Sequence, residues 1–232
     1  MNVEIILGID TSSDYCSVCL YRDGRFFSHH ESLSRQHTQK LLPIIDHLLS
    51  SHQTTLKQLT GIVFGRGPGS FTGIRIGASV AEGLALGLNI PVYPVSNLTA
   101  LALQLSEVRE TWVMPCIDAR MGEVYCCLHQ VDEFGIPVPA ETEKVIVPED
   151  LQMISEARSF VGVGSGWQYL ERFSDFVKSN AAAIYPDISV TAECMIKWVL
   201  AVNPPAISAD MIEPVYLRDK VTWDNKPPVG SV

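Results

Sequence analysis

Hydrophobic residues in the first half of the chain follow the two periods that strands and helices require. Segments 4–10, 16–22 and 25–33 have the composition and length of strands. In the segment 36–51 that follows, Leu41, Ile45 and Leu48 recur at helical spacing and predict a helix with one apolar stripe. The pattern then predicts, in order, a strand at 61–65, a helix at 73–88, a strand at 91–95 and a helix at 97–105.

The second half of the chain repeats this order. Ile9-Asp10 closes one predicted strand and Ile117-Asp118 closes another, and in both halves a second strand ending in Cys-Leu follows. The later elements are predicted as strands at 112–118, 123–131 and 141–146, a helix at 148–156, a strand at 159–163 and helices at 168–177 and 192–202. The repeat predicts two lobes, 1–106 and 107–232, with a loose tail of about ten residues.

Composition and charge narrow the class of protein. With 47% hydrophobic and 19% charged residues the chain is globular. We expect no transmembrane helix and no signal peptide, and six cysteines without an export signal favour reduced thiols in the cytoplasm. The chain has 17 basic and 26 acidic residues, whereas proteins that bind nucleic acid usually have more basic than acidic residues. Any contact with RNA is therefore expected through a partner.

The segment 65–77, GRGPGSFTGIRIG, is the most distinctive in the chain. It joins a predicted strand to a predicted helix, a place where backbone N–H groups converge on anions. It has neither the Gly-Lys-Ser/Thr ending of a Walker A loop nor the G-x-G-x-x-G spacing, and Pro68 removes a donor. A phosphate-binding loop and a tight structural turn both remain open. The residues concerned are Asp10, Thr11, Ser12, Gly67, Gly69, Ser70 and Gly73.

Four segments together are similar to the signatures of the TsaB (YeaZ) family. They are 8–12 (GIDTS), 37–43 (HTQKLLP), 67–77 (GPGSFTGIRIG) and 214–218 (PVYLR), and they occur in family order over most of the chain. The resemblance implies an α/β fold, the duplicated, two-lobed ASKHA fold of actin, Hsp70 and sugar kinases, which is ribonuclease H-like.

The resemblance also implies a function. TsaB proteins act in making threonylcarbamoyladenosine beside the anticodon of tRNAs that read codons starting with A. They are non-catalytic subunits that join the catalytic paralogue TsaD, with TsaE as the ATPase, and they self-associate when alone. A chain of this family would reach tRNA only through the complex, in the cytoplasm and without a membrane.

Few residues support catalysis by this chain alone. ASKHA enzymes hold Mg²⁺ and phosphate with an aspartate placed like Asp10, but after Asp118 the second turn carries Arg120 and Met121 where small residues would be needed. The resemblance places Asn97 and Leu101 where TsaD has two metal-binding histidines. An amide binds transition metals poorly and leucine cannot bind them.

The cysteines offer no metal site either. Cys16 and Cys19 lie three apart on one strand and so point to opposite faces, and adjacent Cys126 and Cys127 have the same defect. We therefore expect no catalytic residue, no metal and no cofactor. The rival interpretations are a small-molecule kinase that uses Asp10 and the glycine turns, and a homodimeric scaffold with no role in tRNA modification.

A stripe of small residues marks the helix at 73–88. Gly73, Gly77, Ala81 and Ala85 recur every four residues, so another helix could approach closely, although the stripe could equally pack on the chain's own sheet. The resemblance implies that TsaD docks on the helices at 36–51 and 73–88. The predicted partner surface comprises Leu41, Ile45, Leu48, Gly73, Arg75, Gly77, Ala81 and Ala85.

Overall fold

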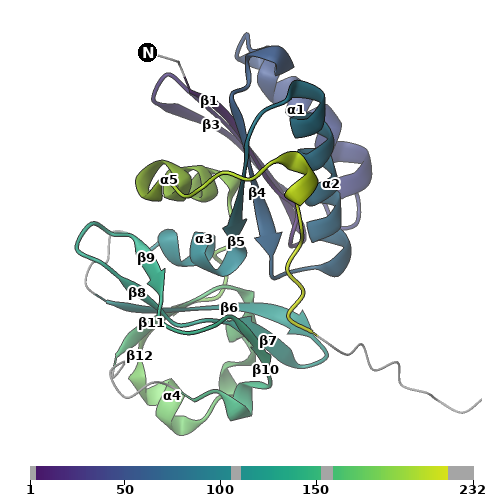
Figure 1. Cartoon of the computed structure of the whole chain (residues 1–232). Helices are drawn as coiled ribbons and strands as arrows, with labels where there is room; N and C mark the ends of the chain where they lie inside the picture. The colour runs from purple at the N-terminus through teal and green to yellow at the C-terminus, as the bar shows by residue number, and fades with distance from the viewer. Residues whose placement is uncertain (1–3, 106–110, 153–158, 219–232) are drawn as a thin grey trace, which may run out of the picture.

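The first lobe is built on a five-stranded sheet (Figure 1). The computed structural model describes residues 4–105, 111–152 and 159–218. The strand order is β3-β2-β1-β4-β5, in which β1, β2 and β3 are antiparallel neighbours while β4 and β5 run parallel to β1. These strands span β1 Ile5–Asp10, β2 Tyr15–Arg22, β3 Arg25–Ser32, β4 Gly61–Gly67 and β5 Val92–Ser96.

The second lobe repeats the plan of the first. Its main strand order, β10-β7-β6-β11-β12, matches β3-β2-β1-β4-β5 in position and direction, with a short β8–β9 hairpin added beside β6. The strands are β6 Trp112–Arg120, β7 Glu123–Cys126, β8 His129–Val131, β9 Pro137–Pro139, β10 Lys144–Ile146, β11 Phe160–Val163 and β12 Ala181–Tyr185. Asp10 and Asp118 lie near the ends of the equivalent strands β1 and β6, which confirms the predicted duplication.

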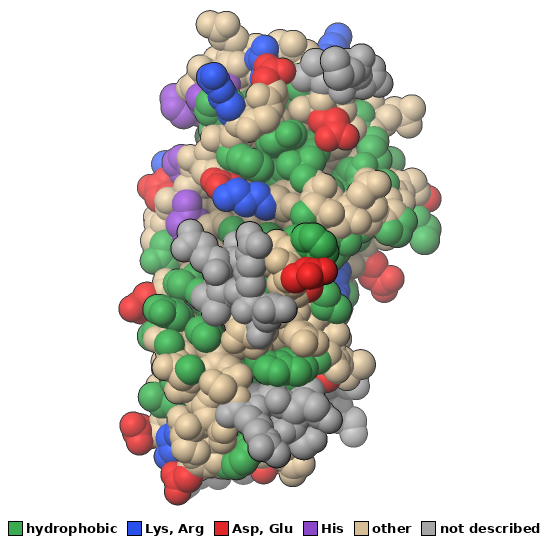
Figure 2. All heavy atoms as spheres, turned by 90° about the vertical axis from the view of Figure 1, so that its left-hand side faces the viewer, with side chains coloured by type: hydrophobic (Ala, Val, Ile, Leu, Met, Phe, Trp, Pro, Cys, Tyr) green, Lys and Arg blue, Asp and Glu red, His purple; other side chains and the backbone are tan. Residues whose placement is uncertain are grey.

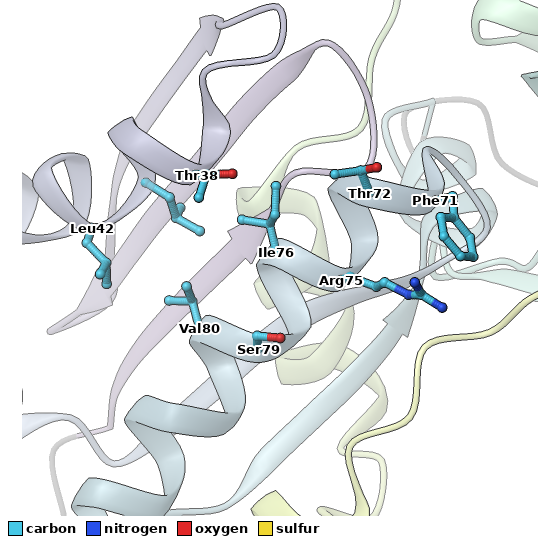
Figure 3. A pocket seen from close by; sticks show the side chains of 9 residues that line it. Thr38, Leu42, Phe71, Thr72, Arg75, Ile76, Ser79 and Val80 are labelled. Atoms are coloured by element: carbon cyan, nitrogen blue, oxygen red, sulfur yellow. The ribbon is translucent and has the colours of Figure 1, made fainter.

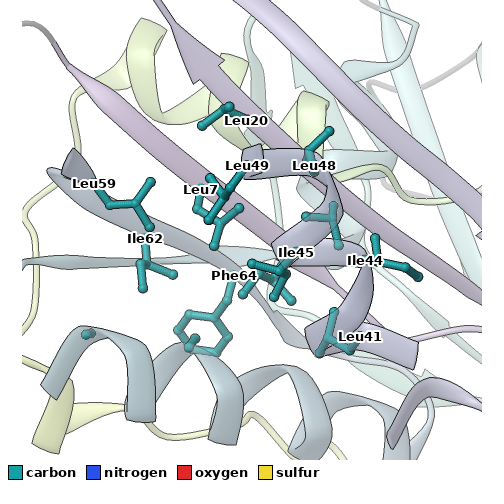
Figure 4. Packing of buried hydrophobic residues seen from close by; sticks show 14 of the residues in the cluster. Leu7, Leu20, Leu41, Ile44, Ile45, Leu48, Leu49, Leu59, Ile62 and Phe64 are labelled. Atoms are coloured by element: carbon teal, nitrogen blue, oxygen red, sulfur yellow. The ribbon is translucent and has the colours of Figure 1, made fainter. Parts of the chain in front are cut away.

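Helices cover both faces of the first sheet (Figure 1). On one face, α1 (His37–Ser51) and α2 (Phe71–Leu88) bury their apolar sides against β1, β2 and β4. Figure 4 shows leucines and isoleucines of α1 packed over Leu7 and Phe64 of the sheet. On the other face, α3 (Asn97–Leu103) and α5 (Ala192–Val202) lie in the cluster of buried side chains that joins the two lobes.

The chain returns to the first lobe after completing the second. Helix α5 packs on β1, β2 and β4, and Ile207 forms backbone hydrogen bonds with Val92 of β5. Beyond it, the Val215 N–H donates to the Arg66 carbonyl oxygen over 2.8 Å. The spatial lobes are therefore not simply the two halves of the sequence. The predicted boundary at 106/107 and the predicted loose tail lie outside the described residues.

Several predicted elements have different bounds in the structure. The predicted strand 123–131 divides into β7 and β8, which pair with different parts of β6. The predicted helix 168–177 is wrong: a 3-10 turn, Ser165–Arg172, is followed by a separate helix α4, Asp175–Asn180. Between them Phe173 takes an extended backbone conformation and stacks on Trp167 with ring centres 4.7 Å apart.

Two further differences concern the second lobe. A 3-10 turn, Pro148–Asp150, begins the segment predicted as a helix at 148–156, and residues 153–158 lie outside the described part. The strand β12 was not predicted, because its sequence, AAAIY, is rich in alanine, the strongest helix former. Parallel pairing with β11 prevails over that local preference.

Helix α2 is both long and apolar. Among the described residues it is the one helix long and apolar enough to cross a membrane by those criteria. It lies on the first sheet, however, with Ala81 and Ala85 almost completely buried. It is therefore a core helix in this fold.

Candidate functional site

The turn after β1 and the glycine loop after β4 meet at a buried polar cluster. The Asn97 side-chain amide donates to Asp10 Oδ1 over 2.7 Å and to Ser12 Oγ over 2.6 Å. Ser12 donates to Asp10 Oδ2 from its hydroxyl over 3.0 Å and from its backbone N–H over 3.3 Å. The Gly67 N–H in turn donates to the Asn97 side-chain oxygen over 2.8 Å. Both oxygens of Asp10 therefore have partners within the chain.

The Asp10 carboxyl group is shielded from solvent. Asp10 is only 2% exposed. Burial raises the pKa of Asp10 to about 6, although the hydrogen bonds from Asn97 and Ser12 lower it. A Cβ at Gly65 would lie 2.3 Å from Asp10 Oδ1, so the backbone of β4 is in close contact with the carboxylate. A phosphate or hydrated Mg²⁺ could reach Asp10 only if these contacts separated.

The remaining loop residues tie α2 to the same turn. The Thr11 hydroxyl donates to the Gly73 carbonyl over 2.7 Å, and the Ser70 N–H donates to the Ser12 carbonyl over 2.7 Å. Ser70 also caps the N-terminus of α2, because its hydroxyl accepts from the Gly73 N–H over 3.3 Å. Gly69 lies against Ser12. The sequence-predicted loop residues thus come together, and they bond mainly to one another.

The second turn is also engaged within the chain. The Asp118 carboxylate accepts from the Arg120 backbone N–H over 2.8 Å, from the Arg120 guanidinium over 3.3 Å and from the Tyr169 hydroxyl over 3.2 Å. Arg120 and Met121 both have positive φ, at 64° and 56°. They follow Asp118 at the same offsets at which the small residues Ser12 and Ser13 follow Asp10.

The structure places the two positions that the resemblance matched to metal ligands inside the core. Asn97 and Leu101 are 0% and 1% exposed. Cys16 and Cys19 lie in different buried clusters, which confirms that they point to opposite faces of β2, and the same holds for Cys126 and Cys127. Within 4–105, 111–152 and 159–218, no group of three His, Cys, Asp or Glu side chains is placed to hold a metal ion.

The predicted partner surface requires correction. The stripe Gly73, Gly77, Ala81 and Ala85 faces the chain's own sheet, and a Cβ on Gly73 would lie 2.0 Å from the Thr11 carbonyl oxygen. The apolar residues predicted on α1, which are Leu41, Ile45 and Leu48, are also buried in that core. Sequence periodicity identified the inner faces of both helices. Of the eight predicted residues, only Arg75 is exposed.

The outer faces of α1 and α2 form an open groove (Figure 3), of whose lining only Leu41 and Arg75 were predicted from the sequence. It has a volume of about 450 Å³. Leu42 and Phe71 on its walls are 54% and 55% exposed, unusually high for such large apolar side chains. Its lining consists of Thr38, Leu41, Leu42, Phe71, Thr72, Arg75, Ile76, Ser79 and Val80. Leu42 lies one position from the predicted stripe, so a second apolar stripe beside the first was the available signal.

Charged groups are dispersed on the face that carries α5. Figure 2 shows lysine and arginine side chains there scattered among aspartates and glutamates, without a single large basic patch. Lys197 on α5, for example, pairs with Glu193 over 2.7 Å. The described side chains visible on this face therefore do not gather into the kind of basic patch that attracts nucleic acid.

Comparison with known proteins gives a consistent family. The family model described as "TsaD: tRNA N6-adenosine threonylcarbamoyltransferase" matches residues 29–223. The "tRNA threonylcarbamoyladenosine biosynthesis protein TsaB" of Escherichia coli is 40% identical over 230 residues, covering 96% of this chain and 98% of that protein. A tRNA N6-adenosine threonylcarbamoyltransferase of Phocaeicola vulgatus is 34% identical over 114 residues, 43% of this chain and 34% of that enzyme.

A solved structure agrees with these sequence relatives. The chain superposes on YeaZ from Pseudomonas aeruginosa with a TM-score of 0.84 and 36% identity, covering 92% of this chain and all of that one. The match extends over both lobes, so the duplicated ASKHA-like plan of the two sheets is shared.

Proposed function

Because the chain belongs to the TsaB family, we propose that it is the non-catalytic partner subunit of a TsaD-type transferase in tRNA threonylcarbamoyladenosine biosynthesis. The observation that carries the proposal is a contrast between two places in the first lobe. The cluster around Asp10, where the fold places chemistry, is closed by its own hydrogen bonds. The α1–α2 groove, where a partner can dock, is open.

The groove has the properties of a protein interface. It is apolar at its centre, with Leu42, Ile76 and Val80, and it carries an aromatic residue and an arginine at one end, Phe71 and Arg75. Buried apolar centres flanked by aromatic and arginine side chains are typical of binding hot spots. We propose that the TsaD-type paralogue occupies this groove with helices of its own, and that a second copy of this chain occupies it when the paralogue is absent.

The remaining roles follow from the same proposal. The acidic net charge of −9 supports contact with tRNA through the partner and not through this chain alone. A TsaE-type ATPase would supply nucleotide hydrolysis, since Asp10 and Asp118 are both engaged within the chain. The kinase interpretation is not favoured for the same reason. We place the complex in the cytoplasm.

The proposal is tested by substitutions inside and outside the groove. Leu42→Asp puts a charge at the centre of the apolar wall, whereas Leu56→Asp makes the same change at a leucine of similar exposure outside the groove. Calorimetry with the TsaD-type protein of the same organism should show binding by the wild-type chain and by Leu56→Asp, and a loss of about a hundredfold or more for Leu42→Asp.

Light scattering and a modification assay complete the test. Leu42→Asp should be monomeric, and a reconstituted complex containing it should no longer modify tRNA. Unchanged affinity in Leu42→Asp would refute the groove as the binding site. Absence of binding by the folded wild-type chain would refute the partner role itself.

A further inference from the structure

Arg75 is held in one orientation at the end of the groove. Its guanidinium carbon lies 3.7 Å from the centre of the Phe71 ring and 5.3 Å from that of the Tyr216 ring. Its Nε donates a hydrogen bond to the Tyr216 hydroxyl over 2.7 Å. The two rings are themselves 5.5 Å apart. Stacking and the hydrogen bond together fix a side chain that is otherwise long and flexible.

Tyr216 is placed by contacts on both sides of it in the chain. The preceding Val215 is bonded to the Arg66 carbonyl of the glycine loop over 2.8 Å. Two residues later, Arg218 donates to the Ala119 carbonyl over 3.2 Å and forms an ion pair with Glu123 in the second lobe. The segment that carries Tyr216 thus runs from the start of α2 to the β6–β7 hairpin, and the aromatic ring is presented at a defined position beside Arg75.

The charge of Arg75 is not neutralised within the described part of the chain. Arg66, Arg172 and Arg218 each pair with a carboxylate, but none of the described Asp and Glu side chains lies within ion-pair distance of Arg75. The groove that it borders is lined by apolar and hydroxyl side chains without an acidic residue. Nε is used by Tyr216, and the two terminal nitrogens have no hydrogen bond or ion pair with the residues that the structure describes, so they remain for a ligand.

We propose that Arg75 is the charged anchor of the partner surface and binds a carboxylate side chain of the TsaD-type partner, with Tyr216 as its positioning residue. This inference rests on the proposed function, because Arg75 continues the same groove. A guanidinium fork matches a carboxylate through two parallel hydrogen bonds. Because Phe71 and Tyr216 fix the side chain before binding, little conformational entropy is lost when the partner arrives.

The test uses three substitutions and one control on the full-length chain. Arg75→Gln removes the charge, Arg75→Lys keeps the charge without the fork, and Tyr216→Phe keeps the ring but removes the hydroxyl that accepts from Nε. Arg25→Gln removes an exposed positive charge from β3, outside the groove. Affinity for the purified TsaD-type protein is measured by calorimetry at several salt concentrations.

We expect Arg75→Gln to weaken binding by about tenfold to a hundredfold and to reduce the salt dependence of the dissociation constant. Arg75→Lys should recover only part of the loss, Tyr216→Phe should weaken binding several-fold, and Arg25→Gln should bind like the wild type. Affinity within twofold of wild type for Arg75→Gln would overturn the inference. So would full recovery by Arg75→Lys, or loss of self-association alone.

These outcomes are separable from failure of the proposed function. If Leu42→Asp abolishes binding while Arg75→Gln does not, the groove docks the partner without this anchor, and only the inference fails. If the wild-type chain does not bind the partner at all, both fail together.

Discussion

The amide group of Asn97 lies 2.7 Å from Asp10 Oδ1, and its oxygen accepts from the Gly67 N–H. One side chain at the start of α3 thereby bonds the end of β1 to the end of β4. These segments form a closed polar core, whereas the groove on the outer side of α1 and α2 is open.

We predict that the purified chain binds Mg²⁺-ATP weakly or not at all. A bound metal would have to displace Asn97 and Ser12 from Asp10, and the Asp118 carboxylate already accepts a hydrogen bond from the Arg120 guanidinium. Calorimetry up to millimolar nucleotide should give no saturable heat. A dissociation constant in the micromolar range, equivalent to about −8 kcal/mol, would favour the kinase interpretation instead.

Replacing Asn97 with alanine should destabilise the fold strongly. The substitution leaves Asp10 Oδ1 and the Gly67 N–H buried without partners, which together cost about 3 kcal/mol. Urea unfolding measures the change, and Gln39→Ala, at an exposed position of α1, serves as the control. Carbon NMR of the side chain should also show the pKa of Asp10 rising above its value of about 6, because a hydrogen bond that lowers it is lost. A stable variant with an unchanged pKa would contradict the account of this cluster.

Two glycines of α2 should respond in opposite ways to the same substitution. A Cβ at Gly83 meets nothing within 4 Å, so Gly83→Ala should raise the free energy of unfolding by about 0.5–1 kcal/mol through helix propensity. A Cβ at Gly77 would lie 2.8 Å from Thr11 Oγ1, so Gly77→Ala should lower it despite the same gain in propensity. Thermal or urea unfolding of the pair decides the point, and a stabilising Gly77→Ala would be incompatible with the packing described.

Ala81→Arg should prevent folding instead of blocking a partner. Ala81 is 0% exposed in the core beneath α2, where an arginine would bury an unpaired charge at a cost of several kcal/mol. Circular dichroism should show loss of the native spectrum. Ser79→Arg, two positions earlier on the exposed side, should fold normally. A folded Ala81→Arg protein would mean that this face of α2 is open.

Buried His129 should make stability depend on pH. Its Nδ1 faces the Cys127 carbonyl at 2.8 Å and its Nε2 faces the Thr99 hydroxyl at 3.0 Å, an arrangement that suits the neutral ring. Burial lowers the pKa of His129 from 6.5 to about 4. The unfolded state therefore binds more protons between pH 4 and 6.5, and this contribution, about 3 kcal/mol when complete, is lost as the pH falls through that window.

Asp10 changes the free energy of unfolding with pH in the direction opposite to that of His129. Its pKa rises from 3.8 to about 6 on folding, so its contribution is present at low pH and is lost as the pH rises through that range. The two effects partly cancel between pH 4 and 6. In His129→Gln the His129 contribution is removed, and unfolding free energy should then decrease as the pH rises from 4 to 6. Parallel pH profiles for the wild type and His129→Gln would contradict this assignment.

Local sequence determined the strands and helices of the first lobe and the duplication. Alternating and helical apolar periods depend only on neighbouring residues, and the segments around β1, β2, α1 and β4 carry them clearly. The spacing of the glycines and the four family segments could also be recognised without a structure. The family that they indicated agrees with the relatives found. The absence of histidines at positions 97 and 101 was equally visible in the chain itself.

Tertiary structure decided which face of each helix was free. The stripe of Gly73, Gly77 and Ala81 suits close packing against any partner, and nothing local distinguishes a foreign helix from the chain's own sheet. Contacts between distant segments determine that the stripe packs on the chain's own sheet. Such contacts also bring Asn97 to Asp10 and place Tyr216 against Phe71 and Arg75. Such contacts join residues far apart in the sequence, so they produce no periodic pattern of residues along it. Only the folded chain brings these residues together.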